Sequence, residues 1–201
     1  MTEEYQMVIV GVGGQGILTI SDVIAIAARK KGLHILGSEV HGMAQKGGSV
    51  ITNLKIGKEL HSPTIPEGSA KVLIGIEENE TLRFIKYLEP NATAITSKTI
   101  LNPVSWKKNK KAAIEAQEKI DENLAKFKAK IIKIDSEALA LEAGLSLAQN
   151  IVLLGVLSQV EGFPLSDEEL KEALKERVPK KYVEQNLKAF ELGKNAIEKT
   201  N

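Results

Sequence analysis

The feature that most constrains the fold is an apolar stretch that runs directly into a glycine-rich loop. Residues 7–12 read Met-Val-Ile-Val-Gly-Val, and Gly11, Gly13 and Gly16 follow the spacing G-x-G-x-x-G. A run rich in β-branched residues is typical of a strand buried on both faces of a sheet. Apolar residues then recur at helical spacing over residues 17–28. The order strand, loop, helix predicts an anion site where the free N–H groups of the helix start are exposed. A tight turn that binds nothing is the alternative.

Length and composition narrow the class of protein. The chain has 201 residues, enough for one domain with a sizeable core, and a formal net charge of +1. Such a balance gives no reason to expect nucleic acid or an anionic membrane as a partner. The absence of cysteine excludes disulfides and an iron–sulfur cluster held by thiolates. No apolar run reaches the length of a membrane span and no secretory signal is evident, so we expect a cytoplasmic protein.

The next segment is predicted to continue an open α/β sheet. Residues 33–36 are expected to form a second strand and to complete a right-handed βαβ unit with the first. The polar, glycine-rich stretch 37–49 is expected to be a loop at the carboxyl end of that strand, where open α/β sheets bind ligands. Apolar and polar residues alternate over 50–56, which predicts a strand with one polar face. Gly57-Lys58 is expected to turn this strand into a hairpin with residues 59–61.

The remaining chain alternates strands and helices and ends in a helical portion. The patterns predict strands at 71–76, 92–96 and 131–134, and helices at about 80–88, 147–160 and 181–198, the second of which is apolar nearly all round. Ser136 is expected to cap one helix, and Ser166 and Glu169 form a capping box for another. The predicted class is α/β: a Rossmann-like, mostly parallel sheet with helices on both faces, one β-hairpin and a helical C-terminal portion.

A highly charged segment at about 106–130 stands apart from this pattern. Its Lys, Glu and Ala content predicts a solvent-facing helix, with Ile114, Ile120, Leu124 and Phe127 as the packing edge. The lysines at 107–111 are interpreted as part of a solvated face.

Several polar residues are candidates for chemistry. Glu39 follows the glycines at about the distance at which a dinucleotide fold places the acid that binds ribose. The three histidines lack metal-ligand spacing, and His41, beside Glu39 and Gln45, is the one most suited to function. Asn150 is a polar residue at the start of the most apolar helix, and the pattern leaves open whether it bonds into the core or reaches the site.

Two motifs taken together resemble a known family. The glycine loop at 11–16 and the stretch Ser38-Glu39-Val40-His41-Gly42-Met43-Ala44-Gln45-Lys46-Gly47-Gly48-Ser49-Val50 resemble the gamma-type domain of the 2-oxoacid:ferredoxin oxidoreductases, in its indolepyruvate-oxidising branch. The likeness extends to residues 148–155, 179–181 and 186–193. It therefore covers most of the chain except the segment near 106–130, and residues 1–201 are interpreted as a single gamma-type domain.

The resemblance implies a non-autonomous subunit of a complex that oxidatively decarboxylates aryl 2-oxoacids such as indolepyruvate to acyl-CoA and passes electrons to ferredoxin. In that family thiamine diphosphate, Mg²⁺ and the iron–sulfur clusters belong to a larger alpha subunit, so this chain alone is expected to be inactive and to hold no metal. Coenzyme A, the co-substrate, is a candidate ligand. The residues carried over as the cofactor-binding set are Gly11, Gly13, Gly14, Gln15, Gly16, Ser38, Glu39, His41, Gln45, Lys46, Gly47, Gly48 and Ser49.

Two other functions fit parts of the sequence. A self-sufficient Rossmann-type oxidoreductase would hold NAD with the glycine loop and Glu39. A purely structural subunit would need the glycine loops for assembly alone.

Overall fold

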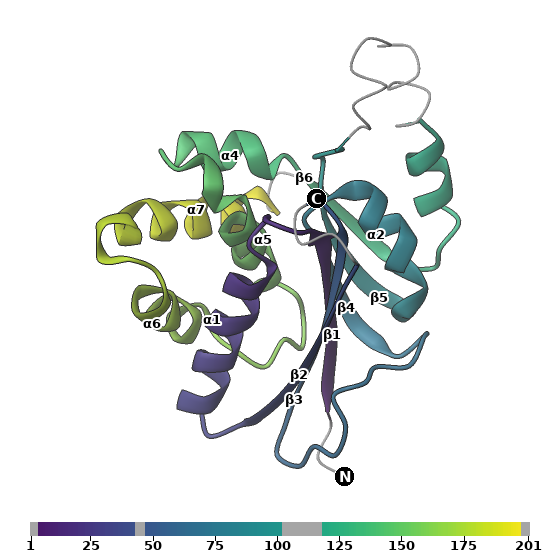
Figure 1. Cartoon of the computed structure of the whole chain (residues 1–201), viewed down its shortest axis with the longest axis horizontal. Helices are drawn as coiled ribbons and strands as arrows, with labels where there is room; N and C mark the ends of the chain where they lie inside the picture. Colours follow the sequence, from purple (N-terminus) through teal and green to yellow (C-terminus); the bar gives the residue numbers. More distant parts are fainter. Residues whose placement is uncertain (1–3, 43–46, 102–117, 198–201) are drawn as a thin grey trace.

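A six-stranded sheet forms the centre of the molecule (Figure 1). The computed structural model describes residues 4–42, 47–101 and 118–197. The strands, in spatial order, are β2 (His34–His41), β3 (Ser49–Gly57), β1 (Tyr5–Val12), β4 (Ala70–Gly75), β5 (Leu88–Ser97) and β6 (Lys130–Ile134). β1, β4, β5 and β6 are parallel neighbours, whereas β3 runs antiparallel to both β1 and β2. The predicted α/β class with a mostly parallel sheet is confirmed.

Strand β1 owes its continuous apolar sequence to burial on both faces. Met7 and Ile9 pack on one side of the sheet, and Val8 and Val10 pack on the other. All four side chains are fully buried. Because successive residues of a strand point to opposite faces, a strand between two helical layers needs apolar residues at every position.

Helices cover both faces of the sheet, as predicted. On one side lie α1 (Ile17–Lys30), α4 (Ser136–Glu142), α5 (Gln149–Leu157), α6 (Asp167–Arg177) and α7 (Val183–Ala196), with the short turns η3 (Ser146–Ala148) and η4 (Lys180–Tyr182) (Figure 1). On the other lie α2 (Glu78–Phe84), η1 (Ile85–Tyr87) and a helical segment at 118–124. The predicted burial of the apolar helix is confirmed, because residues 150–157 of α5 are all buried.

Helices α5 and α7 cross without room for side chains at the contact. A Cβ at Gly155 would lie 2.1 Å from the carbonyl oxygen of Phe190, and a Cβ at Gly193 would lie 1.9 Å from that of Val152. Two glycines therefore let the backbones touch, and α7 covers the outer side of α5.

The β-hairpin differs from the predicted one. β2 continues to His41 and pairs with β3, so that residues 37–41, expected in a loop, are strand. Residues 59–61 form no strand. β1, α1 and β2 form a βαβ connection as predicted, because both strands run antiparallel to β3 and are therefore parallel to each other. β3 lies between them, however, so the two strands are not neighbours. β2 and β3 pair in register over eight positions, more than the three-residue partner at 59–61 could offer.

The helix caps and the charged segment agree with the sequence predictions in part. The capping box of Ser166 and Glu169 is confirmed. The helix at Ser136 is capped instead by Asp135, whose carboxylate accepts the N–H of Ala138, because Ser136 is buried and bonds Ser97. In the charged segment, Ile120 and Leu124 pack as predicted whereas Phe127 is exposed. Ile114 and the lysines at 107–111 lie outside the described residues.

Candidate functional site

The two glycine-rich stretches of the sequence meet at the carboxyl end of β1. The N–H of Gly13 donates to the carbonyl oxygen of Gly48 at 2.8 Å, and the N–H of Gly47 donates to that of Gly13 at 3.3 Å. Gly47 has a φ of 77°, a conformation that side chains other than glycine rarely adopt. The hairpin end and the glycine loop are therefore one hydrogen-bonded unit, which uses the N–H of Gly13 internally.

Gln15 braces the glycine loop from within. Its Oε1 accepts the N–H of Val12 at 2.8 Å. A Cβ at Gly11 would approach this oxygen to 2.8 Å and the Cβ of Ile76 to 3.3 Å. A side chain at Gly11 would therefore have little room and would displace the Gln15 amide, whose acceptor end holds the turn closed.

Asn150 connects the glycine loop to the core. Its Nδ2 donates to the carbonyl oxygen of Gly16 at 3.0 Å, and its Oδ1 accepts the N–H of Ile151 at 2.9 Å. Gly16, the N-cap of α1, has a φ of 80°, and a Cβ there would lie 2.5 Å from Nδ2 of Asn150. Both interpretations left open by the sequence hold, because the side chain is buried and contacts the candidate site.

The start of α1 offers unpaired donors. The N–H groups of Gly14, Gly16, Ile17 and Leu18 make no hydrogen bond to the part of the chain that the structure describes, whereas Thr19 N–H donates to Gly16. The first turn of α1 contains no acidic side chain that would neutralise the positive end of the helix dipole. Free donors and a positive helix end together favour an anionic group such as a phosphate.

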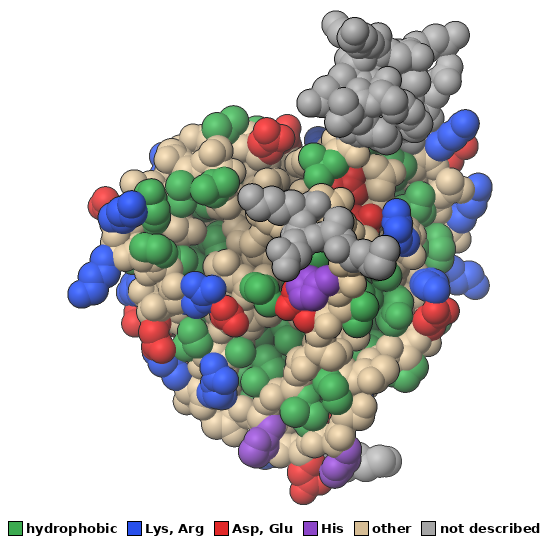
Figure 2. Space-filling view, viewed as in Figure 1, with side chains coloured by type: hydrophobic (Ala, Val, Ile, Leu, Met, Phe, Trp, Pro, Cys, Tyr) green, Lys and Arg blue, Asp and Glu red, His purple; other side chains and the backbone are tan. Residues whose placement is uncertain are grey.

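A pocket of about 320 Å³ opens beside these donors. Its walls are formed by Val12, Gly13, Gly14, Gly16, Ile17, Leu18, Glu39, His41 and Val50. Nε2 of His41 lies 3.0 Å from Oε1 of Glu39, two residues away on the same side of β2. In Figure 2 a histidine side chain and neighbouring acidic atoms lie near the centre of this view, above a group of hydrophobic side chains, whereas most lysine and arginine side chains lie nearer the rim. The pocket thus combines backbone donors, an apolar wall and one carboxylate–imidazole pair.

The other candidate residues lie elsewhere. Because side chains alternate along a strand, the Ser38 hydroxyl lies on the opposite side of β2 from Glu39. There it accepts a hydrogen bond from Nδ2 of Asn53 at 3.2 Å. The Ser49 hydroxyl donates to the buried carboxylate of Glu80. Gln45 and Lys46 lie outside the described residues. The structure therefore brings the glycine loop, Glu39 and His41 together, and directs Ser38 and Ser49 toward other partners.

An acidic run at the carboxyl end of β4, which contacts Ser49 through Glu80, was not identified from the sequence. The carboxylate of Glu77 accepts the N–H groups of Glu80 at 2.8 Å and of Leu101 at 3.0 Å, and it caps α2. Glu78 is fully buried and pairs with Lys133. Burial lowers the pKa of Lys133, but Asp121 and Glu78 raise it more, so the net pKa is raised. The signal available was the cluster of acids directly after a buried apolar strand.

The arrangement disfavours the dinucleotide interpretation. In that fold the acid that binds ribose follows the strand next to the glycine-loop strand. Here β3 separates β1 from β2, which carries Glu39. Glu39 therefore lies two strands away from β1, and the expected NAD geometry is not formed.

The described residues contain neither a cluster suited to a metal ion nor a helix suited to crossing a membrane. No group of three or more His, Asp or Glu side chains among them is placed to hold a metal ion. Within the same ranges, none of the helices has the length and apolar character needed to cross a bilayer.

Comparison with known proteins assigns the family. The chain is 40% identical over 196 residues to indolepyruvate oxidoreductase subunit IorB of Thermococcus kodakarensis, which covers 96% of each protein. It resembles the crystal structure of a keto/oxoacid ferredoxin oxidoreductase gamma subunit from Geobacter sulfurreducens, with a TM-score of 0.72, 22% identity and coverage of 96% of this chain and 99% of that one.

A second solved structure shares the fold within a longer chain. It is 2-oxoglutarate:ferredoxin oxidoreductase from Magnetococcus marinus with 2-oxoglutarate, coenzyme A and succinyl-CoA bound. The TM-score is 0.74 at 21% identity, and the match covers 99% of this chain and 32% of that one. The family model described as pyruvate ferredoxin/flavodoxin oxidoreductase matches residues 6–196. This chain therefore belongs to the pyruvate ferredoxin/flavodoxin oxidoreductase family.

Proposed function

We propose that this chain is the smaller, non-autonomous subunit of a complex that oxidatively decarboxylates aryl 2-oxoacids such as indolepyruvate to acyl-CoA, with ferredoxin as electron acceptor. The observation that carries the proposal is the 40% identity to an indolepyruvate oxidoreductase subunit over nearly the whole length of both chains. The larger alpha subunit would hold thiamine diphosphate, Mg²⁺ and the iron–sulfur clusters, and the complex would work in the cytoplasm. Thiamine diphosphate supplies the carbanion stabilisation that 2-oxoacid decarboxylation requires.

The role proposed for this chain is to bind a phosphate-bearing group at the start of α1. The donor set fits such a group, because four backbone N–H groups without partners in the described chain surround the end of a helix that has no acidic first turn. The phosphates of coenzyme A are the proposed ligand. Glu39 and His41 also line the pocket, where they would contact the less charged part of that ligand.

The subunit assignment is tested by purification and reconstitution. The tagged chain is purified from its own cells and assayed for indolepyruvate- and coenzyme A-dependent reduction of a viologen dye. The expected result is a brown complex that contains thiamine and is active, and no turnover by the chain alone. A chain that purifies without a partner, or one that binds NADH and turns over alone, would contradict the proposal.

The phosphate site is tested with a charge at Leu18, which lines the pocket and is half exposed. Leu18→Asp places a negative charge among the free donors, so the KM for coenzyme A of the reconstituted complex should rise at least tenfold. Thermal stability should not fall, because an acid in the first turn of a helix is favourable. Leu18→Asn, of nearly equal size and no charge, is the matched control. If the two variants have the same KM, the loop serves assembly alone and the purely structural interpretation holds.

A further inference from the structure

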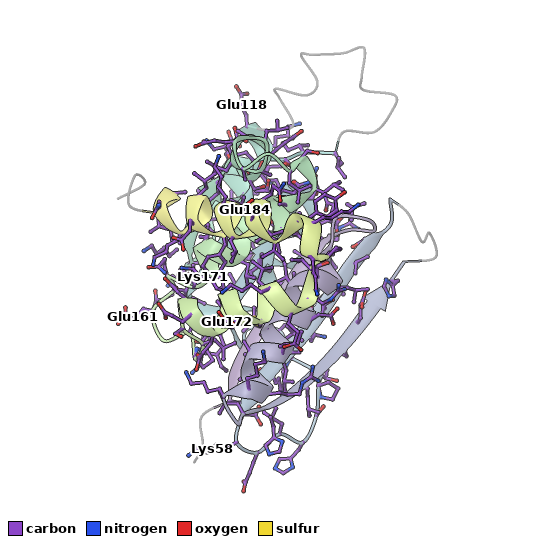
Figure 3. The ribbon with its side chains drawn as sticks, turned by 90° about the vertical axis from the view of Figure 1, so that its left-hand side faces the viewer. Lys58, Glu118, Glu161, Lys171, Glu172 and Glu184 are labelled. Atoms are coloured by element: carbon purple, nitrogen blue, oxygen red, sulfur yellow. The ribbon has the colours of Figure 1, made fainter. Side chains whose placement is uncertain are left out.

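Strand β2 forms an outer edge of the sheet. In the described chain its only strand neighbour is β3, with which it pairs without interruption from His34 to His41. Figure 3 shows β2 and β3 at the right-hand border of the molecule, on the side away from α6 and α7. The other side of β2 therefore presents an ordered row of backbone groups.

The register identifies the free backbone groups. Gly42 N–H donates to the carbonyl oxygen of Ser49 at 3.0 Å, immediately beyond the pair His41–Val50. In an antiparallel ladder, hydrogen-bonded pairs alternate with pairs that are not hydrogen-bonded. The even-numbered residues of β2 therefore bond β3, and Ile35, Gly37 and Glu39 direct their N–H and C=O groups away from the sheet.

The two edges of the sheet differ in how they are protected. β6 has five residues, of which Lys130 and Lys133 are charged. β2 has eight residues and contains no lysine, proline or bulge, and its Val40 side chain is 59% exposed. Natural sheets protect free edges with short strands, lysine, proline or bulges, and an edge without them is suited to pairing with another strand.

We propose that β2 pairs antiparallel with β2 of a second copy of this chain, centred on Ser38. The two strands form a hydrogen-bonded ladder only if the outward-directed, odd-numbered residues of one copy face those of the other. The two-fold axis that relates the copies must therefore pass beside one residue of β2 and not between two residues. Centring on Ser38 places Leu36 opposite Val40 of the second copy and covers that exposed side chain. Centring on Glu39 would place two carboxylates opposite each other, and centring on Gly37 would oppose two residues without side chains.

This pairing joins two sheets into one and brings the second copy to the candidate site. In the Ser38-centred register, Glu39 faces Gly37 of the second copy, and Ile35 of that copy lies beside His41. Because Glu39 and His41 line the pocket, the second copy would extend its wall. The inference rests on the edge geometry alone and does not depend on the proposed function.

The absence of native cysteine allows a direct test. Two Ser38→Cys residues would face each other at about 4.5 Å between Cα atoms, which permits a disulfide. Mild oxidation should convert most of this variant to a covalent dimer on a non-reducing gel. Val40→Cys, on the same face of the strand, is the matched control. In the proposed register the Cα atoms of the two residues at position 40 would lie about 13 Å apart, so these cysteines should not link. Leu36→Cys mixed with Val40→Cys should link only to each other.

Mass measurement of the unmodified chain provides the second readout. Light scattering of the wild-type protein at micromolar concentration should give twice the chain mass of 21.8 kDa. Val40→Lys should give a monomer with an unchanged circular dichroism spectrum. A monomeric wild-type chain, or cross-linking of Val40→Cys or of Lys130→Cys on β6 as fast as that of Ser38→Cys, would overturn the proposal. An edge that pairs only with a strand of another protein would appear as the first of these results.

Discussion

The side-chain amide of Asn150 fixes the start of α1 by donating to the carbonyl oxygen of Gly16, 134 positions earlier in the chain. The same amide group satisfies the N–H of Ile151 at the start of α5. Sequence reasoning could identify Asn150 as unusual, since it is polar and precedes an apolar helix. It could not assign the partner, because the contact depends on how two distant elements pack.

The contact between Asn150 and Gly16 predicts that substitutions at these two residues have coupled effects on stability. Asn150→Ala removes two hydrogen bonds at a buried position, and we expect a loss of about 1–3 kcal/mol in the free energy of unfolding. Gly16→Ala introduces strain at a positive φ and a clash with the Asn150 amide. In the double variant the clash is absent, so the cost should be smaller than the sum of the two single costs. Urea unfolding of all four proteins measures this, and additive costs would show that the two residues do not interact.

The carboxylate of Glu169 makes the stability of the fold depend on pH. Burial raises the pKa of Glu169, but the N–H of Ser166 and the ammonium of Lys31 lower it more, so the net pKa lies below its ordinary value. A carboxyl whose pKa is lowered by folding stabilises the fold at pH values above its pKa in the unfolded chain, about 4.3. This stabilisation is lost as the pH falls through the pKa of the folded state.

The pH effect is measured by comparing Glu169→Gln with the wild type. The variant should be less stable at pH 7, and the difference should shrink as the pH is lowered toward 3. In a Lys31→Met background the difference at pH 7 should be smaller, because one partner of the carboxylate is missing. A difference that is independent of pH would mean that Glu169 acts through its shape and hydrogen bonds and not its charge.

At the scale of elements, the contact between α5 and α7 depends on Gly193. Gly193→Ala would place a Cβ against the backbone of Val152, so the helices must move apart. Overpacking of this kind costs typically 1–3 kcal/mol, and we expect a loss of about 3 kcal/mol because the clash is with backbone. Asn195→Ala, at an exposed position of the same helix, is the control and should change stability little. Equal melting temperatures for the two variants would show that α7 can shift freely.

Elements with strong local signals were predicted well from the sequence. β1 from Met7 onward and α5 from Ile151 onward are apolar, and Ser166 and Glu169 carry a specific capping pattern, so each could be identified without the fold. The hairpin could not. Gly37 and Ser38 favour loops locally, whereas in the fold they are held in β2 by pairing with Leu54 and Asn53 of β3. Such pairing between segments overrides local preference, and it also determines which side of β2 carries Glu39.

For the whole molecule, α5 should be the most stable part. Its residues Ile151 to Leu157 are at most 1% exposed, and it packs between the sheet and α7. We expect its amides to exchange with solvent only on global unfolding, so that their protection matches the free energy of urea unfolding. Hydrogen exchange followed by mass spectrometry measures this. Peptides of α6, which has one exposed face, should exchange earlier, and the opposite order would refute this view of the core.

The position of α5 also determines when the chain can fold during its synthesis. The strands emerge from the ribosome first, but the helices that cover most of one sheet face, α5 to α7, lie in residues 149–196. Until those residues leave the exit tunnel, α1 and α4 are the only helices of the described chain available to cover the side of β1 that carries Met7 and Ile9. A nascent chain halted before residue 149 therefore keeps apolar surface open to chaperones, and the native core closes only after residues 149–196 have left the tunnel.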